Sequence, residues 1–334
     1  MNDAWLALTS EPALEPELPL CDPHHHLWEF PGSRYLAAEM LAELGGHRVT
    51  HTVFVECVQH YRADGKEPLR PVGETEFVAQ LAAAGDLTPG IPRFAAGIVA
   101  FADLTLGDAV EDVLSAHLAA SNRVRGIRYA TAWDASNEIR RSHTHPPPGL
   151  TGEPRFRAGI AALERLGLRF DAWLYHTQFA ELVELAIRFP DLRIVLDHMG
   201  GPLGIGPYSS RRQEVFNDWR TNLAAVASCP NVSIKLGGRM MTSAGFGWHK
   251  RPTPPGSEEL AAAIHPYFDA CIQLFGPERC MLESNFPMDR ASCSYGILWN
   301  AFKRVTAHYA LGERARLLRE TAMDFYRLDA AAGP

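Results

Sequence analysis

Several features common in other protein classes are missing from this sequence. Its six cysteines are scattered and form no Cys-x-x-Cys pair, whereas a disulfide scaffold needs denser cysteine in a shorter chain. We therefore expect reduced thiols and a cytoplasmic protein. No window approaches the ~18 apolar residues that span a bilayer. Residues 1–19 have neither a basic start nor a long apolar run, which predicts neither a signal peptide nor a transit peptide.

Positive charge is also scarce. The 32 basic and 39 acidic residues give a net charge of -7, and no basic run alternates with aromatic residues. This balance argues against a nucleic-acid partner. The sequence has no internal repeat and no break in composition. We therefore expect an N-terminal extension over residues 1–17 and a single domain over residues 18–330.

What the chain does have is a regular alternation of strand-like and helix-like segments. Eight strand-then-helix units predict one (β/α)8 TIM barrel, an α/β fold of ordinarily ~250 residues with its active site at the C-terminal ends of the strands. The rival, an open doubly wound sheet, would want a Gly-rich turn after the first strand, and none is present. The predicted strands are the histidine segment from residue 18, then 49–56, 93–101, 124–129, 168–175, 192–196, 232–236 and 280–283; the predicted helices are 74–84, 107–120, 154–166, 178–189, 211–227, 258–275, 296–308 and 313–325.

The first strand contains His24, His25 and His26. Side chains at i and i+2 of a strand share one side, so His24 and His26 face together and His25 faces away. Such a pair is half of a metal site, or two groups that titrate near neutral pH. Three histidines in a row are equally compatible with a solvated loop.

Polar residues fall where several predicted strands end, and barrel loops bring such residues together. They are Glu56, Arg128, His176, Asp197, His198, Glu283 and Asn285, with Lys235 inside the seventh strand. A lone residue of this kind is more often structural than functional, but the repeated pattern predicts one site at the C-terminal end of the barrel.

In their order along the chain, four motifs resemble those of the amidohydrolase-related, metal-dependent hydrolases of TIM-barrel fold. They are Asp22-Pro23-His24-His25-His26-Leu27-Trp28, Arg125-Gly126-Ile127-Arg128, Leu196-Asp197-His198-Met199-Gly200-Gly201-Pro202 and Ser284-Asn285-Phe286-Pro287. The similarity runs from about residue 18 to the end. The branch it resembles contains sugar lactonases, sulfomuconolactone hydrolases and 2-pyrone-4,6-dicarboxylate lactonase, with aromatic-acid decarboxylases as more distant relatives.

The resemblance implies a divalent metal held by histidines: His24, His26, His198 and His176 are the expected ligands. Neutral imidazoles suit Zn²⁺, or Mn²⁺ if carboxylates join them. Such a metal would polarise a scissile carbonyl and lower the pKa of a bound water from ~16 toward ~7.

Asn285 departs from the family, which usually has an aspartate there as metal ligand or base. An amide takes no proton from water and is a poor zinc ligand. Three explanations stay open. In the first, another carboxylate is the base, and the candidates are Glu56, Glu283, Asp197 and Asp289. In the second, His176 accepts the proton while Asn285 hydrogen-bonds the substrate carbonyl or oxyanion. In the third, the metal, or even hydrolysis, has been lost.

The expected substrate is a small molecule. Arg128 and Arg125 are predicted to pair with the carboxylate of the substrate. Lys235 and Tyr61 are also predicted to contact the substrate, Tyr61 as part of the pocket wall. A salt bridge between Glu56 and Arg128 or Lys235 is the plain alternative for these charges. The chain is thus predicted to be a hydrolase that opens a carboxylate-bearing lactone, and its outer helices are compatible with a homodimer. The alternatives are a nonoxidative decarboxylase and a catalytically silent relative that binds a small acid.

Overall fold

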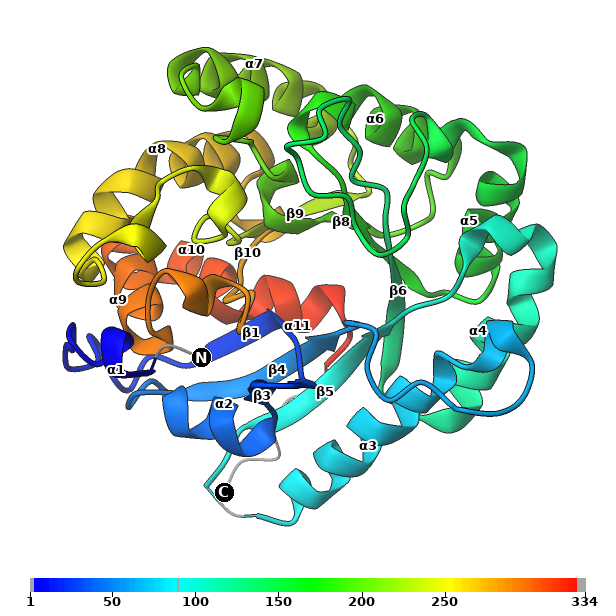
Figure 1. Cartoon of the computed structure of the whole chain (residues 1–334), viewed down its shortest axis with the longest axis horizontal. Coiled ribbons are helices and arrows are strands. Elements are labelled where there is room, and N and C mark those ends of the chain that lie inside the picture. The colour runs from blue at the N-terminus through cyan, green and yellow to red at the C-terminus, as the bar shows by residue number, and fades with distance from the viewer. Residues whose placement is uncertain (1–2, 89, 329–334) are drawn as a thin grey trace.

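The computed structural model describes residues 3–88 and 90–328. Eight parallel strands form one sheet whose spatial order follows the chain, and helices surround it on the outside (Figure 1). The strands of this sheet are β1 (Leu20–His25), β4 (Val49–Val55), β5 (Arg93–Ala100), β6 (Val124–Ala130), β7 (Arg169–Trp173), β8 (Ile194–Leu196), β9 (Val232–Leu236) and β10 (Cys280–Leu282). A small hairpin, β2 (Trp28–Phe30) and β3 (Ser33–Tyr35), follows β1.

The sheet closes on itself through the segment that follows β10. The backbone N–H of Asn285 donates to the carbonyl oxygen of His24 at 2.9 Å, and the N–H of His26 donates to that of Phe286 at 2.7 Å. The predicted (β/α)8 barrel is confirmed, and closure excludes the doubly wound alternative, whose outer strands stay unpaired.

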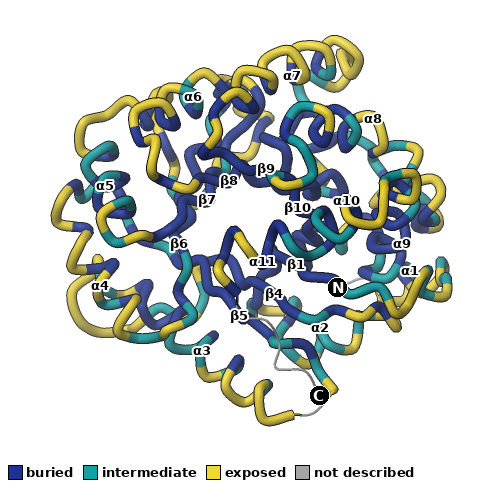
Figure 2. Tube along the Cα trace, turned by 180° about the vertical axis from the view of Figure 1, so that it is seen from behind, coloured by how far each residue is buried: buried dark blue, intermediate teal, exposed yellow. Residues whose placement is uncertain are grey.

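The helices shield the outer face of the barrel, with their buried sides inward and their exposed sides toward solvent (Figure 2). Their bounds are α1 (Asp3–Leu6), α2 (Ala37–Glu43), α3 (Val72–Asp86), α4 (Val110–Ala120), α5 (Pro154–Arg165), α6 (Phe179–Arg188), α7 (Arg212–Ala227), α8 (Ser257–Phe275), α9 (Tyr295–Thr306), α10 (Leu311–Ala315) and α11 (Thr321–Phe325). The helix predicted over 313–325 is confirmed, and a π-helical turn, Arg316–Glu320, lies within it between α10 and α11. No helix within the described residues is long and apolar enough to cross a membrane.

The C-terminal segment fills the interior of the barrel from its N-terminal end. Side chains of α11 and the residues after it form one buried cluster with inward-facing residues of the strands. Its members are Cys21, Val53, Val55, Ala96, Val99, Val195, Met281, Ala322, Met323, Phe325, Tyr326 and Leu328. Because this cluster fills the interior at this end, we expect the active site at the opposite end of the strands.

The N-terminal extension lies against α8 and α9. Glu11 accepts hydrogen bonds from the backbone N–H of Ser257 at 2.8 Å and from Asn300 Nδ2 at 3.2 Å. Glu15 pairs with Arg314 at 2.6 Å. The extension is thus packed on the barrel, and a domain boundary near residue 17 stays a prediction.

Helix α5 shows how closely the outer ring approaches the loops of the barrel. It begins with Pro154, whose missing N–H costs nothing in a first turn. At Gly159, a Cβ atom would lie 2.3 Å from the carbonyl oxygen of Leu104. This backbone-to-backbone contact admits only glycine.

We predict that Gly159→Ala destabilises the fold by about 1–3 kcal/mol, because overpacking against backbone cannot be relieved by rotating a side chain. Gly312→Ala is the matched control, since a Cβ there meets nothing within 4 Å; we expect no loss of stability from it. Urea unfolding of both variants measures the difference. Equal stability of the two variants would contradict this packing argument.

Candidate active site

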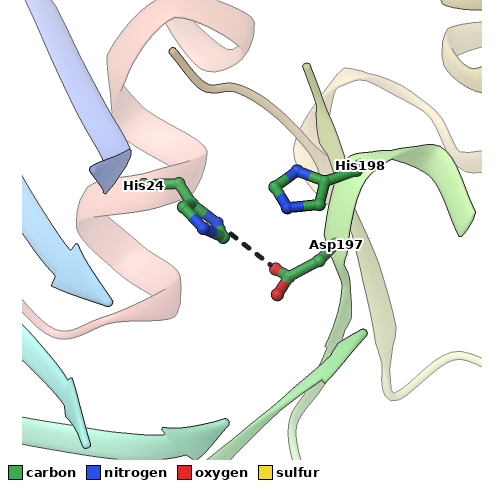
Figure 3. A group of neighbouring side chains, drawn as sticks. All are labelled: His24, Asp197 and His198. Atoms are coloured by element: carbon green, nitrogen blue, oxygen red, sulfur yellow. Dashed lines mark ion pairs between the residues drawn. The ribbon is translucent and has the colours of Figure 1, made fainter. Parts of the chain in front are cut away.

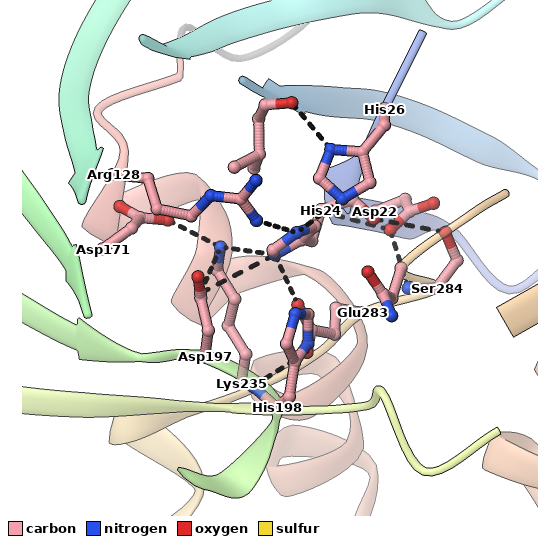
Figure 4. Close-up of polar contacts among 12 residues, drawn as sticks. Asp22, His24, His26, Arg128, Asp171, Asp197, His198, Lys235, Glu283 and Ser284 are labelled. Carbon is pink, nitrogen blue, oxygen red and sulfur yellow. Dashed lines mark hydrogen bonds and ion pairs between the residues drawn. The ribbon is translucent and has the colours of Figure 1, made fainter. Parts of the chain in front are cut away.

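The His-x-His pair stands at the C-terminal end of β1, where the side chains point into the barrel (Figure 4). The Nε2 atoms of His24 and His26 lie 3.3 Å apart, and His26 Nδ1 lies 2.8 Å from the carbonyl oxygen of Val55. His25 points away and its Nε2 lies 3.0 Å from Thr52 Oγ1. The predicted facing of the three rings is therefore confirmed. Burial lowers the pKa of both His24 and His26, which favours neutral imidazoles.

Glu283 clamps two of the imidazoles. One of its carboxylate oxygens lies 2.8 Å from His24 Nδ1 and the other 2.6 Å from His198 Nδ1. The backbone N–H of His198 also donates to it, at 3.2 Å. Burial alone would raise the pKa of Glu283, but the two histidines outweigh it and hold the pKa at about 2. Such a carboxylate stays ionised and is a weak base, so we remove Glu283 from the candidates for proton acceptor.

Lys235 lies beneath the histidines. Its Nζ lies 2.7 Å from Asp171 Oδ2, 3.0 Å from Asp197 Oδ1 and 3.1 Å from His24 Nδ1. The side chain is fully buried; burial opposes its charge, yet the two carboxylates hold its pKa above the ordinary value. Tyr326 also donates to Asp171, at 2.6 Å. Lys235 therefore supports the site from below, and the predicted direct contact with substrate is not supported.

Arg128 and Glu56 form a buried pair on the other side of His24. Arg128 Nε lies 2.8 Å from Glu56 Oε1, and Arg128 Nη2 donates to the carbonyl oxygen of Glu56 at 2.6 Å. Arg128 Nη1 lies 3.4 Å from His24 Nε2. His143 approaches the second oxygen of Glu56 at 3.7 Å. The plain alternative for these two residues, a salt bridge in the barrel mouth, is confirmed.

Asp22 ties β1 to the segment after β10. Its carboxylate accepts from the backbone N–H of Ser284 at 3.0 Å and from the hydroxyl of Tyr295 at 3.0 Å. Burial raises the pKa of Asp22 to about 6. The aspartate that opens the first motif therefore fixes the position of the strand that carries His24.

Asn285 follows β10 with a φ of 55°, in the left-handed region. Its Nδ2 donates to Asp289 Oδ1 at 2.9 Å, and Asp289 Oδ2 accepts from the backbone N–H of Met240 at 3.2 Å. Because Nδ2 donates to Asp289, the side-chain oxygen Oδ1 of Asn285 is the atom that can accept a hydrogen bond from another group. Burial raises the pKa of Asp289 to about 7.

Three predicted site residues lie apart from this cluster. His176 contacts Tyr208, with ring centres 5.5 Å apart. The possible ligand atoms of His24, Asp197 and His198 lie within 4.8 Å of one another (Figure 3), and His26 adjoins this group because its Nε2 lies 3.3 Å from that of His24. No described contact joins His176 to either. Burial lowers the pKa of His176 to about 4. Arg125 lies at the opposite, N-terminal end of β6 and donates to the carbonyl oxygens of its neighbours, so its predicted contact with substrate needs correction.

Tyr61 stays near the mouth of the barrel. Burial, followed by the nearby carboxylates of Glu74 and Glu56, raises the pKa of its hydroxyl. That hydroxyl has no hydrogen-bond partner within the part of the chain the structure describes. The prediction that Tyr61 lines the pocket remains a prediction.

The three remaining histidines fit a divalent cation. Each has its Nδ1 next to an acceptor, Glu283 for His24 and His198 and a backbone carbonyl for His26. For His26 and His198 we assign the proton to Nδ1, which leaves Nε2 as the ligand atom, the arrangement that metal-binding histidines adopt. His24 also faces two cations, Lys235 Nζ at 3.1 Å from its Nδ1 and Arg128 Nη1 at 3.4 Å from its Nε2. Two imidazole nitrogens on one tetrahedral Zn²⁺ stand roughly 3.3 Å apart, and the His24 and His26 Nε2 atoms show this separation.

The charges of the buried side chains around the histidines also fit a bound divalent cation. Four carboxylates contact this centre, namely Glu56, Asp171, Asp197 and Glu283, against two fixed cations, Arg128 and Lys235. The excess of two negative charges among these six described residues equals what one divalent cation would neutralise. Burying uncompensated charge is expensive, so the charges also fit a bound cation.

Two members of the cluster were missed in the sequence. Asp171 lies within the apolar strand Phe170-Asp171-Ala172, and the reasoning applied to Glu56, a carboxylate in an apolar strand, would have found it. Tyr326 gives no such signal, because it comes from the helix that enters the barrel from below.

The chain belongs to the amidohydrolase family, whose model matches residues 21–328. Among its relatives, protein y4mH of Sinorhizobium fredii is 30% identical over 93% of this chain and 99% of its own length. An L-fucono-1,5-lactonase of Burkholderia ambifaria is 30% identical over 72% of this chain and 73% of its own.

A solved structure shares the whole fold. An amidohydrolase of Burkholderia multivorans, crystallised with bound zinc, superposes with a TM-score of 0.72. It is 21% identical and the match covers 93% of this chain and 99% of that one. The likeness establishes the shared barrel.

We predict that Asn285→Asp destabilises the protein by about 1–3 kcal/mol, because a carboxylate would replace a donor beside the buried carboxylate of Asp289. The double variant Asn285→Asp/Asp289→Asn is the control: the amide at position 289 can donate to position 285 and still accept from Met240. Thermal unfolding should show stability lost in the single variant and largely regained in the double. A double variant less stable than the single one would contradict this assignment.

Proposed function

We propose that this protein is a hydrolase that opens a small lactone by attack of water at the C-terminal end of its barrel. The observation that carries the proposal is the gathering of three imidazoles beside the guanidinium of Arg128: Glu283 contacts Nδ1 of His24 and of His198, and His26 Nε2 lies 3.3 Å from His24 Nε2. The lactonase relative and the zinc found in a protein of the same fold support it.

We propose His24, His26 and His198 as the residues that would hold the metal, with zinc favoured by three neutral nitrogen donors. A bound divalent cation polarises a carbonyl group and lowers the pKa of water. Glu283 orients the rings of His24 and His198, since its two oxygens lie 2.8 Å and 2.6 Å from their Nδ1 atoms.

Arg128 is proposed to orient the substrate. Its Nε and Nη2 are fixed by Glu56, so the remaining N–H groups on Nη1 are the ones aimed toward the centre. A donor held in this way can hydrogen-bond a carbonyl oxygen and stabilise the negative charge that develops on it.

For the proton acceptor we propose Asp289. A general base works best when its pKa lies near the working pH, and burial brings that of Asp289 to about 7. Among the other candidates, the pKa values of Glu283 and Asp197 are both lowered, and Glu56 is paired with Arg128. Asn285, hydrogen-bonded to Asp289, is proposed to hold the attacking water through its carbonyl oxygen.

The charges favour a neutral substrate over the carboxylate-bearing lactone expected from the sequence. Arg128, the expected carboxylate ligand, is already neutralised by Glu56, and Arg125 lies at the other end of β6. A substrate carboxylate would be the fifth in a centre that already holds four. We therefore infer that a hydroxylated, uncharged lactone is the preferred substrate.

We predict about one equivalent of zinc or manganese in the purified protein, lost in His24→Ala/His26→Ala together with lactone opening. Mass spectrometry measures the metal, and a pH-indicator assay measures the acid released from neutral and carboxylated lactones. His249→Ala, which removes an exposed histidine outside both groups of possible metal ligands, is the control and should change neither. If metal-free protein opens lactones, the proposed metal requirement is wrong. Release of carbon dioxide would instead indicate a decarboxylase.

We predict that kcat/KM rises with pH through about 7, because the base acts only after it loses its proton. Asp289→Asn should lower kcat/KM by about 10²–10⁴-fold and remove this rise. Asp191→Asn, a change at an exposed carboxylate, should leave the pH profile intact. An unchanged profile in Asp289→Asn would assign the proton transfer to another residue.

A further inference from the structure

Two histidines and an aspartate meet on the outside of the barrel, where α8 packs against α9 (Figure 1). His265 and Asp269 belong to α8, and His308 follows the end of α9 at Thr306. Residues four apart on a helix share one face, so His265 and Asp269 project to the same side. No described contact joins these three side chains to the histidine centre of the barrel.

The three side chains are close enough to share one ion. Their possible ligand atoms all lie within 4.8 Å of one another, and His308 Nε2 lies 3.7 Å from Asp269 Oδ1. The ring centres of His265 and His308 are 5.7 Å apart. Ligand atoms on one tetrahedral Zn²⁺ stand roughly 3.3 Å apart. Because both imidazoles are exposed, small rotations of their side chains can close the remaining gap.

Tyr309 holds the carboxylate of Asp269 in place. The Tyr309 hydroxyl donates to Asp269 Oδ1 at 2.8 Å. A hydrogen bond of this kind is the usual support of a carboxylate that binds a metal. Within residues 3–88 and 90–328, the ion pair recorded for Asp269 is the one with His308, and neither Lys nor Arg pairs with it. A metal ion would therefore displace no fixed cation from this carboxylate.

A surface groove beside His265 leaves room for a further ligand. Its volume is about 350 Å³, and it is lined by Ala261, Ala262, His265, Pro266, Arg304 and Val305. The guanidinium in this lining, that of Arg304, is paired with Glu258 at 3.2 Å. Water can therefore complete the coordination from the solvent side, as it does in zinc sites with three protein ligands.

We propose that His265, Asp269 and His308 form a second metal site, which binds one divalent transition-metal ion of the zinc class and ties α8 to the end of α9. Two imidazoles and one carboxylate suit Zn²⁺, Ni²⁺ or Cu²⁺. Mg²⁺ and Ca²⁺ prefer ligand sets made of oxygen alone. This second site is independent of the metal proposed for the barrel.

The second site binds more weakly than the buried histidine centre, because its ligands face water and must close around the ion. Dialysed protein therefore keeps the metal of the barrel, and the second ion binds when zinc is added. Since the fold brings α8 and the end of α9 together, the ion binds the folded chain and raises the midpoint of thermal unfolding as its concentration rises. The rate of lactone opening should be unchanged.

Calorimetric titration of the dialysed full chain with zinc chloride tests the proposal. We expect a saturable event of one ion per chain, with a dissociation constant raised at least tenfold in His265→Ala and in His308→Ala. Asp269→Asn should also weaken binding, although its amide oxygen can still accept from Tyr309. His249→Ala, at an exposed position outside the group, is the matched control and should bind as the wild type does.

The double variant His24→Ala/His26→Ala separates this site from the histidine centre. The weaker event and the rise of the unfolding midpoint with zinc should both persist in it. If they disappear there, the ion occupies the barrel and the proposal is wrong. A wild type with no saturable event beyond the barrel metal, or equal weakening by His249→Ala and His265→Ala, would also overturn it. The imidazoles replaced at positions 265 and 308 are exposed, so loss of the fold does not confuse the comparison.

Discussion

The carboxylate of Glu283 is the interaction on which the candidate site depends. It contacts the Nδ1 atoms of His24 and His198, which come from the ends of β1 and β8, and so orients both rings. Because the two histidines hold its pKa at about 2, this carboxylate is ionised at neutral pH. A single carboxylate thus fixes two rings that the backbone alone would leave free to rotate.

A second layer of charge supports this clamp from below. Lys235 lies between Asp171 and Asp197, and Tyr326 ties Asp171 to the helix that fills the barrel. Buried ion pairs of this kind contribute little net stability, because desolvation offsets their attraction. Their effect here is to fix the position of the Lys235 ammonium, which lies 3.1 Å from His24 Nδ1 and so limits the movement of that ring toward the barrel interior.

The fold and the centre of the site could be predicted from the sequence because both depend on local periodicity. Alternation along β1 placed His24 and His26 on one side, and the ends of several other strands marked residues of the mouth. Residues whose role depends on depth or on a distant partner could not be placed. Arg125 and Arg128 belong to one strand, but they stand at its two ends, about 10 Å apart along the chain. Lys235 is covered from below by a helix whose entry into the barrel has no signature in the sequence.

Anomalous diffraction at the zinc edge, from crystals grown with zinc, tests the central claim most directly. We predict one peak at about 2.0–2.1 Å from the Nε2 atoms of His24, His26 and His198, a distance typical of zinc bound to imidazole. A crystal with no peak there, from protein that still opens lactones, would contradict it. The imidazoles would then serve as proton-transfer groups and not as metal ligands.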